Sequence, residues 1–460
     1  MNLEGDKRLF QLRLDFSSAP KGEARQARRE DIESLSAVSE PERPADTSRT
    51  MEEVCERANL KEALRQVRAN KGSAGVDRMT VDQLGDYLKQ HWPAIREQLL
   101  SGIYEPKPVR RVEIPKPDGG VRKLGIPTVL DRFIQQAVMQ VLQKRWNPTF
   151  SPYSYGFRPK RSAHQAVAQA QQYIVQGYGW VIDLDLEKFF DRVNHDKLMG
   201  QIAKRVEDKR LLKLIRAFLN AGVMENGLVS PSVEGTPQGG PLSPLLSNLV
   251  LHELDRELEQ RGHRFVRYAD DCNIYVRSER AGQRVMESIK RFITEKLKLK
   301  VNEAKSAVAR PQERKFLGFS FTAGPDIKRI IAPKSLDRFK RRIREITRRA
   351  KGVSIETTME ELAPYLRGWR GYFGFCQTPA VLVALTRWVR LRLRAALWRQ
   401  WKTPRRRRAA LIALRVSGEL RNTAASGRGP WHIARSKALS VGLSNAYFKS
   451  LGLPSLVEAR

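Results

Sequence analysis

The stretch FVRYADDCNIYV, residues 265–276, decides the fold class of this 460-residue chain. Two β-rich arms flank a central acidic pair, Asp270 and Asp271, so the stretch predicts a hairpin with the pair at its tip. Two adjacent carboxylates repel each other unless a divalent cation neutralises them. An isolated Asp-Asp pair is most often a loop turn, but the flanking strands favour a metal site here.

A second acidic cluster lies upstream in WVIDLDLEKFFD, residues 180–191. Its first part predicts a strand over 180–186, whose alternation puts Asp183 and Asp185 on one face and apolar residues on the other. If this strand neighbours the hairpin, Asp185 and the acidic pair form a three-carboxylate pocket. Such a pocket suits two Mg²⁺ ions about 3.5–4 Å apart, which would activate a 3′-hydroxyl and clamp a transferring phosphate.

A Gly/Pro-rich segment, GTPQGGPLSPLLSN at residues 235–248, lies between the two acidic clusters. Glycine and proline at this density predict a tight turn before a helix, where the backbone can approach a nucleotide closely. Such a loop is weak evidence by itself. Its order relative to the two acidic clusters is a much more specific signal.

The charge of the chain predicts a polyanionic partner. Lys and Arg number 84 and Asp and Glu 50, which gives a formal net charge of +34. Residues 331–460 hold 28 of the basic residues and 7 of the acidic ones, a net +21. Five of the eight tryptophans are in this region: Trp369, Trp388, Trp398, Trp401 and Trp431. Basic residues interleaved with aromatic ones favour nucleic acid, although a solvated basic face over an aromatic core is the alternative for any single residue.

Composition also excludes several classes of protein. Hydrophobic residues make up 41%, enough for sizeable cores, and no run of 18 apolar residues or secretory signal is evident. The three cysteines, Cys55, Cys272 and Cys376, lie too far apart in sequence for a zinc knuckle or a disulfide framework. We therefore expect no membrane partner, a reducing compartment, most simply the bacterial cytoplasm in association with RNA or the nucleoid, and oxygen ligands for any metal.

The remaining patterns predict an α+β fold. Residues 109–126 predict a β-hairpin, and a helix is expected near Glu187. Helical periodicity covers residues 51–66, 129–145, 162–176 and 242–261 and almost everything after residue 335. Strands mixed with helices, followed by a basic helical region, predict an α+β core and a separate all-α module.

The motifs YADD, DLDLEKFFD and TPQGGPLSPLLSN together resemble those of a reverse transcriptase. In particular, the chain resembles the intron-encoded proteins of bacterial group II introns, which combine reverse transcriptase and maturase activity. The resemblance runs from about Leu60 to the C-terminus and implies a right-hand polymerase with an antiparallel palm sheet. It divides the chain into a flexible leader (1–50), fingers and palm (51–325), a helical thumb and maturase domain (326–408) and a basic DNA-binding tail (409–460).

The resemblance also implies roles for residues in the acidic clusters. Asp185, Asp270 and Asp271 match the catalytic, metal-binding carboxylates, with two Mg²⁺ ions as the cofactor. Phe190 matches the bulky steric gate that excludes the 2′-hydroxyl. The alternative, a packed palm aromatic, fits the neighbouring Phe189 better.

Four further residues match nucleotide-binding positions of the family. Gln238 matches the glutamine that lies against the incoming nucleotide, and Lys116 and Arg122 match fingertip residues that grip the triphosphate. An exposed hairpin charge is the alternative for these two basic residues. Lys305 resembles the motif lysine near the nucleotide phosphates.

The function implied by the resemblance is RNA-directed DNA synthesis, together with binding of the parent group II intron RNA to assist splicing and support mobility. The expected partners are the intron RNA, an RNA template, a DNA primer and target, and deoxynucleoside triphosphates, while the oligomeric state is left open. The alternatives are a splicing-only maturase, a reverse transcriptase with a host role such as defence or repair, and a basic RNA chaperone. Many relatives carry an HNH nuclease after the tail, and its cysteine and histidine pairs are not expected here, since His432 is the last histidine.

Overall fold

The computed structural model describes residues 48–115, 120–225, 228–230, 235, 239–348, 352–425 and 429–457. The chain falls into two compact units, the first ending at Arg310 and the second beginning at Pro311. Each unit has its own hydrophobic core. Within the described ranges, no helix has the length and apolar composition needed to cross a membrane.

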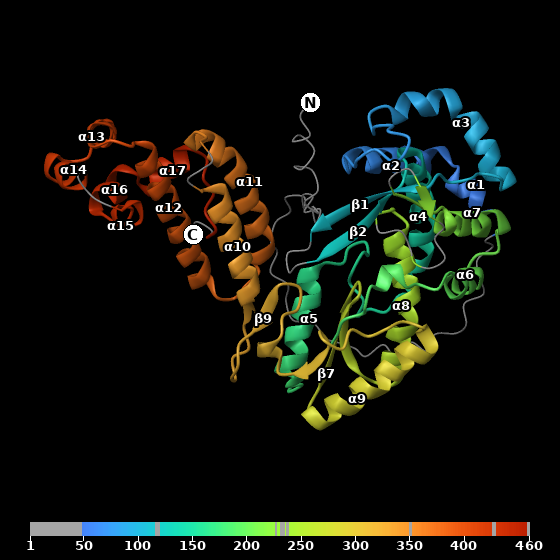
Figure 1. Cartoon of the computed structure of the whole chain (residues 1–460). Coiled ribbons are helices and arrows are strands. Elements are labelled where there is room, and N and C mark those ends of the chain that lie inside the picture. Colours follow the sequence, from blue (N-terminus) through green and yellow to red (C-terminus); the bar gives the residue numbers. More distant parts are fainter. Residues whose placement is uncertain are drawn as a thin grey trace, which may run out of the picture. The chain divides into compact units, whose positions relative to one another are not determined.

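The first unit opens with three helices, α1 (Thr50–Val54), α2 (Arg57–Ala69) and α3 (Leu84–Ser101) (Figure 1). The sequence predicts one helix over 51–66, whereas the structure has two. The break lies at Glu56, whose extended conformation (ψ 138°) interrupts the helical hydrogen bonds.

The predicted hairpin over 109–126 is confirmed as strands β1 (Val109–Pro115) and β2 (Val121–Ile126), which pair antiparallel. A short strand, β4 (Val223–Glu225), extends this sheet by pairing parallel with β1, and β5 (Leu228–Ser230) pairs with β4. The strand order is therefore β2-β1-β4-β5.

The second sheet of this unit contains both acidic clusters. Its four strands, in the spatial order β6-β7-β3-β8, are all antiparallel to their neighbours. They span Arg264–Tyr268 (β6), Asp271–Val276 (β7), Trp180–Leu184 (β3) and Ala307–Ala309 (β8). This antiparallel sheet confirms the predicted palm, including the predicted hairpin and the predicted neighbouring strand.

Six longer helices complete the first unit: α4 (Val129–Trp146), α5 (Ala163–Val175), α6 (His195–Ala203), α7 (Lys209–Asn220), α8 (Ser243–Gln260) and α9 (Glu279–Phe292). Helices α5 and α8 pack against β6, and α9 packs against β3, β7 and β8 (Figure 1). Short 3-10 turns lie at Asn147–Thr149 and Phe189–Asp191, and a π-helical turn follows α9 at Ile293–Leu297.

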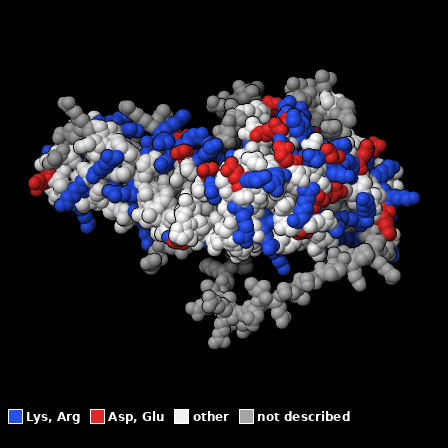
Figure 2. Space-filling model, turned by 90° about the horizontal axis from the view of Figure 1, so that it is seen from below, with Lys and Arg blue, Asp and Glu red and all other residues white. Residues whose placement is uncertain are grey.

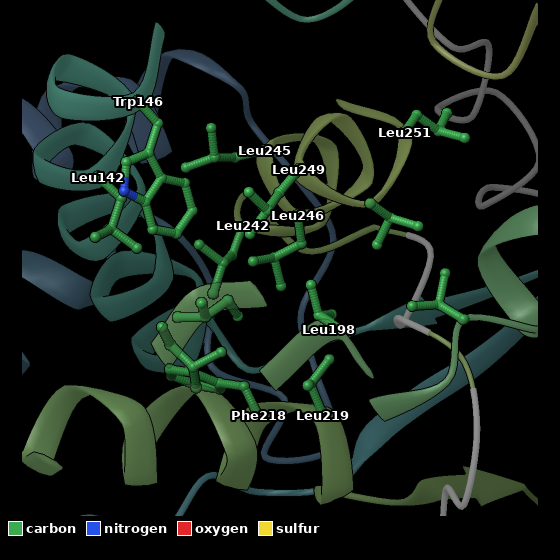
Figure 3. Close-up of a cluster of buried hydrophobic side chains, with 14 of the residues drawn as sticks. Leu142, Trp146, Leu198, Phe218, Leu219, Leu242, Leu245, Leu246, Leu249 and Leu251 are labelled. Atoms are coloured by element: carbon green, nitrogen blue, oxygen red, sulfur yellow. The ribbon is translucent and has the colours of Figure 1, made fainter. Parts of the chain in front are cut away.

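Leucines of α8 fill the core where four helices meet. Figure 3 shows Leu245, Leu246 and Leu249 of α8 facing Leu142 of α4 and Leu198 of α6. All five side chains are buried, so α8 is the central helix of this unit. The residues that follow the Gly/Pro-rich segment are thereby fixed in place.

The prediction of a helix starting near Glu187 is wrong. Lys188 has a left-handed backbone (φ 49°), and only a 3-10 turn follows it. The next helix, α6, begins at His195, where the Asn194 side chain accepts a hydrogen bond from the Lys197 amide and caps the helix.

The second unit is helical apart from one strand pair, as predicted for the residues after 335. Strands β9 (Phe319–Phe321) and β10 (Arg329–Ile331) pair antiparallel, after a 3-10 turn at Pro311–Glu313. The helices are α10 (Pro333–Ile346), α11 (Ile355–Phe373), α12 (Pro379–Gln400), α13 (Pro404–Ala413), α14 (Gly418–Ala425), α15 (Pro430–Ile433), α16 (Lys437–Gly442) and α17 (Asn445–Ser450).

The C-terminal helices share one core with α10, α11 and α12. Leu439 and Phe448 are fully buried in the same cluster as Phe339 and Leu393. Residues 409–425 and 429–457 are therefore packed into the second unit in this structure. The predicted boundaries of fingers and palm, thumb and tail remain predictions.

Candidate active site

The acidic pair lies at a tight hairpin turn. The last paired residues of β6 and β7 are Tyr268 and Asp271, so Ala269 and Asp270 form the turn. Ala269 has a left-handed backbone (φ 57°), which costs a residue with a β-carbon roughly 1–2 kcal/mol relative to the right-handed region. The surrounding structure must therefore hold this turn.

Asp185 reaches the same end of the sheet on the neighbouring strand. The paired register of β3 with β7 ends at Leu184 opposite Cys272, so the next step along both strands sets Asp185 beside Asp271. The Asp185 amide donates to Ser306 Oγ (3.0 Å), and its carbonyl accepts from the Asn302 amide (2.8 Å). The backbone of Asp185 is thus fixed from the side opposite the hairpin.

These carboxylates suit a divalent cation by their chemistry, because carboxylate oxygens are the ligands that Mg²⁺ prefers. Within the described ranges, however, no three His, Cys, Asp or Glu side chains are grouped so that they could hold an ion together. The fold brings Asp185, Asp270 and Asp271 to one end of one sheet but does not preassemble a closed metal cage.

Lys305 lies at this site, next to Asp185. Its Nζ is 3.8 Å from Asp185 Oδ2, and the Lys305 side chain is 66% exposed. An exposed pair of this length stabilises the fold by only about 0–1 kcal/mol. Lys305 therefore balances the charge of Asp185 without locking it, and its predicted contact with nucleotide phosphates stays a prediction.

Phe190 lies in the 3-10 turn that follows β3. Its ring is partly buried and stands edge-on to that of Phe189, with centroids 5.2 Å apart. Phe189 is buried in the core, as the sequence predicts for the packed aromatic of the pair. Phe190 thus retains exposed surface that a substrate could contact.

The Gly/Pro-rich segment begins against the backbone of Phe190. Gly235 has a φ of 89°, and a β-carbon there would lie 2.8 Å from the Phe190 carbonyl oxygen. The Gly235 amide donates to the Val193 carbonyl (2.9 Å), and its carbonyl is 2.6 Å from Nε2 of the buried His195. Only glycine fits at this position, which ties the segment to the acidic cluster of β3.

Further along the segment, Gly239 and Gly240 lie against β2 and α4. A β-carbon on Gly239 would lie 2.7 Å from the Gly125 carbonyl oxygen, and one on Gly240 would lie 2.3 Å from Oε1 of Gln135. The two glycines therefore let the backbone pass closely between β2 and α4. The fold thus brings the described glycines of the Gly/Pro-rich segment next to the Phe190 turn and to β2.

Three predicted nucleotide-binding side chains are not placed. Lys116 and Gln238 lie outside the described residues. The backbone of Arg122 lies in β2, paired with Ile114, but its side chain is outside the description. Their roles stay predictions.

The sequence prediction missed a charged side chain directly beneath the acidic turn. Arg267 of β6 is fully buried and donates to both carboxylate oxygens of Asp255 on α8 (2.6 and 2.5 Å). Burial alone would lower the pKa of the Arg267 guanidinium, but the Asp255 carboxylate raises it above its ordinary value, so the guanidinium stays charged. The available signal was an arginine inside a hydrophobic strand and an aspartate inside an apolar helix.

Basic side chains cover much of the surface. Figure 2 shows Lys and Arg over both units in the face that it presents, with fewer Asp and Glu on the second unit. This distribution agrees with the charge count along the chain. A phosphate backbone is attracted to such a surface.

Two families match separate parts of the chain. Residues 114–321 match "Reverse transcriptase (RNA-dependent DNA polymerase)", and residues 336–411 match "Group II intron, maturase-specific domain". The first match contains every predicted site residue, from Lys116 to Lys305. The chain therefore joins a reverse transcriptase domain to a maturase domain, and reverse transcriptase domains generally use divalent metal ions.

Several proteins are similar to this chain. Protein YkfC of Escherichia coli (strain K12) is 40% identical over 208 residues, which cover 44% of this chain and 55% of that protein. The group II intron-encoded protein LtrA of Lactococcus lactis subsp. cremoris is 31% identical over 323 residues, covering 56% and 54%. The putative COX1/OXI3 intron 2 protein of Saccharomyces cerevisiae is 31% identical over 247 residues, covering 52% and 28%. The chain thus spans about half the length of the first two relatives.

A solved structure also matches, a chain of a "Cas6-RT-Cas1--Cas2 complex", with a TM-score of 0.35 and 23% identity over 54% of this chain and 26% of that one. The two matches show a reverse transcriptase domain followed by a group II intron maturase-specific domain. The similarity to LtrA, a group II intron-encoded protein, agrees with this pair of domains.

Proposed function

We propose that this chain is an RNA-directed DNA polymerase that extends a DNA primer on an RNA template. We further propose that it binds group II intron RNA as a maturase, assists its splicing and supports intron mobility by cDNA synthesis. The observation that carries the polymerase proposal is the placement of Asp185, Asp270 and Asp271 at one end of an antiparallel sheet, inside the reverse transcriptase match. The bacterial cytoplasmic location stays a prediction.

The three aspartates would hold two Mg²⁺ ions, which would activate the primer 3′-hydroxyl and neutralise charge on the transferring phosphate. Asp185 comes from one strand and the acidic pair from the turn beside it, so the site is assembled only when β3 and β7 are paired. Lys305 would move from Asp185 to the nucleotide phosphates, because its ion pair is long and exposed.

The Gly/Pro-rich segment would form one wall of the nucleotide site. Its glycines bring backbone close to the Phe190 turn at one end and to β2 at the other. Gln238 lies between them in sequence, and Lys116 and Arg122 belong to the adjoining hairpin. In this arrangement Phe190 would contact the sugar, Gln238 the nucleotide, and the two basic residues the triphosphate.

Intron RNA binding is supported by the second unit. It includes the maturase match and carries most of the net positive charge. Arg405, Arg406 and Arg408 lie exposed near the N-terminus of α13, where the helix dipole is also positive. The phosphates of an RNA backbone would neutralise this positive charge.

Primer extension on an RNA template, with deoxynucleotides and Mg²⁺, tests the proposal. We compare the wild type with Asp270→Ala/Asp271→Ala and with a control, Asp86→Ala/Glu97→Ala, which removes two exposed acids from α3. We expect full-length cDNA from the wild type and the control, and none from the site variant, with intron RNA binding retained by all three.

Two results would contradict the proposal. Loss of both synthesis and RNA binding in the site variant would mean that the acidic pair is structural. Absence of cDNA from a wild type that binds intron RNA would favour a splicing-only maturase.

A further inference from the structure

A fully buried ion pair lies two residues from the acidic turn. Neither Arg267 nor Asp255 has measurable exposure, although both are charged. Replacing such a pair by well-packed apolar residues is often neutral or stabilising, because removing two charges from water is unfavourable. Its contribution to stability is therefore a weak explanation for its presence next to the site.

The guanidinium of Arg267 also reaches the turn itself. Its Nη1 donates to the carbonyl of Ala269 (2.9 Å), the residue with the left-handed backbone, and to Oδ1 of Asn248 (3.1 Å). Its Nη2 donates to Ser154 Oγ (2.7 Å) as well as to Asp255. One planar side chain therefore joins the turn, helix α8 and the loop before α5, in a geometry that a lysine ammonium cannot reproduce.

The loop before α5 closes on the other side of the turn. A β-carbon on Gly156 would lie 2.2 Å from the Ala269 amide nitrogen, so the two backbones touch. The Asn248 amide donates to the Gly156 carbonyl (2.8 Å) and thereby holds this loop in place. The turn is thus enclosed between the Arg267 side chain and the Gly156 backbone, and both are fixed by helix α8.

We propose that Arg267, Asp255 and Asn248 are positioning residues that hold the turn of Asp270 and Asp271 in the conformation that binds metal, which rests on the polymerase function proposed above. None of the three residues is a metal ligand. They act through the backbone of Ala269, in the way that partners behind metal ligands orient those ligands in other sites.

The chain offers a matched control for a purely structural ion pair. The Asp208 side chain is 1% exposed and forms an ion pair with Arg210 (2.9 Å). It also accepts hydrogen bonds from the amide of Met51 and from amides in the first turn of α7. These partners, Met51, Arg210 and Leu211, all lie away from the acidic turn. Asp208→Asn therefore removes a buried carboxylate of the same kind away from the turn.

The experiment compares the full-length wild type with Asp255→Asn, Asn248→Ala and Asp208→Asn. Three quantities are measured: the melting temperature, Mn²⁺ binding by electron paramagnetic resonance without nucleic acid or nucleotide, and amide hydrogen exchange of residues 264–276. Asn248→Ala leaves the ion pair intact, so it provides a folded variant if Asp255→Asn unfolds.

We expect Asn248→Ala and Asp255→Asn to weaken Mn²⁺ binding by about tenfold and to speed exchange in residues 264–276. Asp208→Asn should lower the melting temperature but leave both quantities unchanged. Unchanged Mn²⁺ affinity in Asn248→Ala, equal loss in Asp208→Asn, or a wild type that binds no Mn²⁺ would overturn the proposal. Primer extension by the wild type, run in parallel, separates this failure from failure of the proposed polymerase function.

Discussion

The ring of Phe190 differs from that of its neighbour in one respect that matters for a substrate. Phe189 is held in the core, whereas Phe190 keeps exposed surface, and Gly235 packs on its carbonyl oxygen. As the predicted gate, this ring would exclude a ribose hydroxyl by filling the space beside the sugar.

Replacing this ring tests the gate. In Phe190→Ala we expect incorporation of ribonucleotides, relative to deoxynucleotides, to rise roughly tenfold to a hundredfold, the range over which an apolar site rejects an added hydroxyl. The measurement is primer extension with each nucleotide type in turn. Phe190→Leu, which keeps a bulky side chain, is the control, and unchanged sugar selectivity in Phe190→Ala would remove the gate assignment.

At the residue scale, the sequence predicted the groups whose position follows from local pattern. Strand alternation and the hairpin motif predicted where each aspartate lies within its own segment, and the pairing of β3 with β7, which the prediction assumed, sets Asp185 beside Asp271. Arg267 was missed because its burial depends on contacts between separate elements: Asp255 on α8 lies 12 residues away in sequence, and Ser154 lies 113 residues away. An arginine in a strand is usually solvated, and no local pattern reveals that it is buried.

Among the secondary-structure elements, helix α8 carries a buried polar stripe. Asn248, His252 and Asp255 lie one turn apart in succession and are all buried. The His252 ring stands edge-on to Phe150 at 5.6 Å. Burial, followed by the positive charge of Arg205, lowers the pKa of His252 from 6.5 to about 3.

This shift predicts a loss of stability in mild acid. Between pH 6.5 and 3 the unfolded chain protonates His252 and the folded chain does not, so stability falls as the pH drops below 6.5. At pH 5 the loss is about 2 kcal/mol of unfolding free energy, from about 1.4 kcal/mol per pH unit.

Denaturant unfolding at pH 7, 6 and 5 measures this loss. We expect a shallower pH dependence in His252→Gln, whose side chain does not titrate. His263→Gln is the control, because the pKa of His263 is lowered without a large shift. Parallel curves for the wild type and His252→Gln would contradict the assignment.

Elements with a strong helical or alternating period were predictable, including α4, α5 and α8 and the hairpin of β6 and β7. The prediction of a helix near Glu187 failed, because the backbone of Lys188 is left-handed where Leu186 forms a β-bridge with Val301 on another segment. A tertiary contact overrode the local preference there.

For the molecule as a whole, the net charge predicts how binding to RNA responds to salt. Affinity for a single strand should fall with salt by a slope of about 0.7 per phosphate neutralised. We expect Arg405→Gln/Arg406→Gln/Arg408→Gln in α13 to reduce the magnitude of this slope by about 2. Filter binding of intron RNA at several salt concentrations measures it.

The charge-preserving control replaces the same three arginines by lysine and should keep the wild-type slope. An unchanged slope in the glutamine variant would show that this turn of α13 does not touch phosphate. A flat salt response of the wild type would mean that shape rather than charge dominates.

The division into units was only partly predictable. Composition indicated a basic helical part, and the structure has a second compact unit that begins at Pro311. The strand pair from Phe319 to Ile331 belongs to that unit because Phe319 packs on Tyr372 and Phe373 of α11. These contacts join residues about fifty positions apart in the chain, which no local pattern indicates.

The two separate hydrophobic cores also have a consequence for inheritance. The residues at the end of the β3–β7 sheet are not part of the second core, so substitutions there change no residue of that core. The site and the second core can therefore evolve independently. A lineage that needs only RNA binding can lose the aspartates by drift without losing the basic helical unit. A lineage that needs only DNA synthesis can likewise keep the aspartates and lose the basic surface of the helical unit.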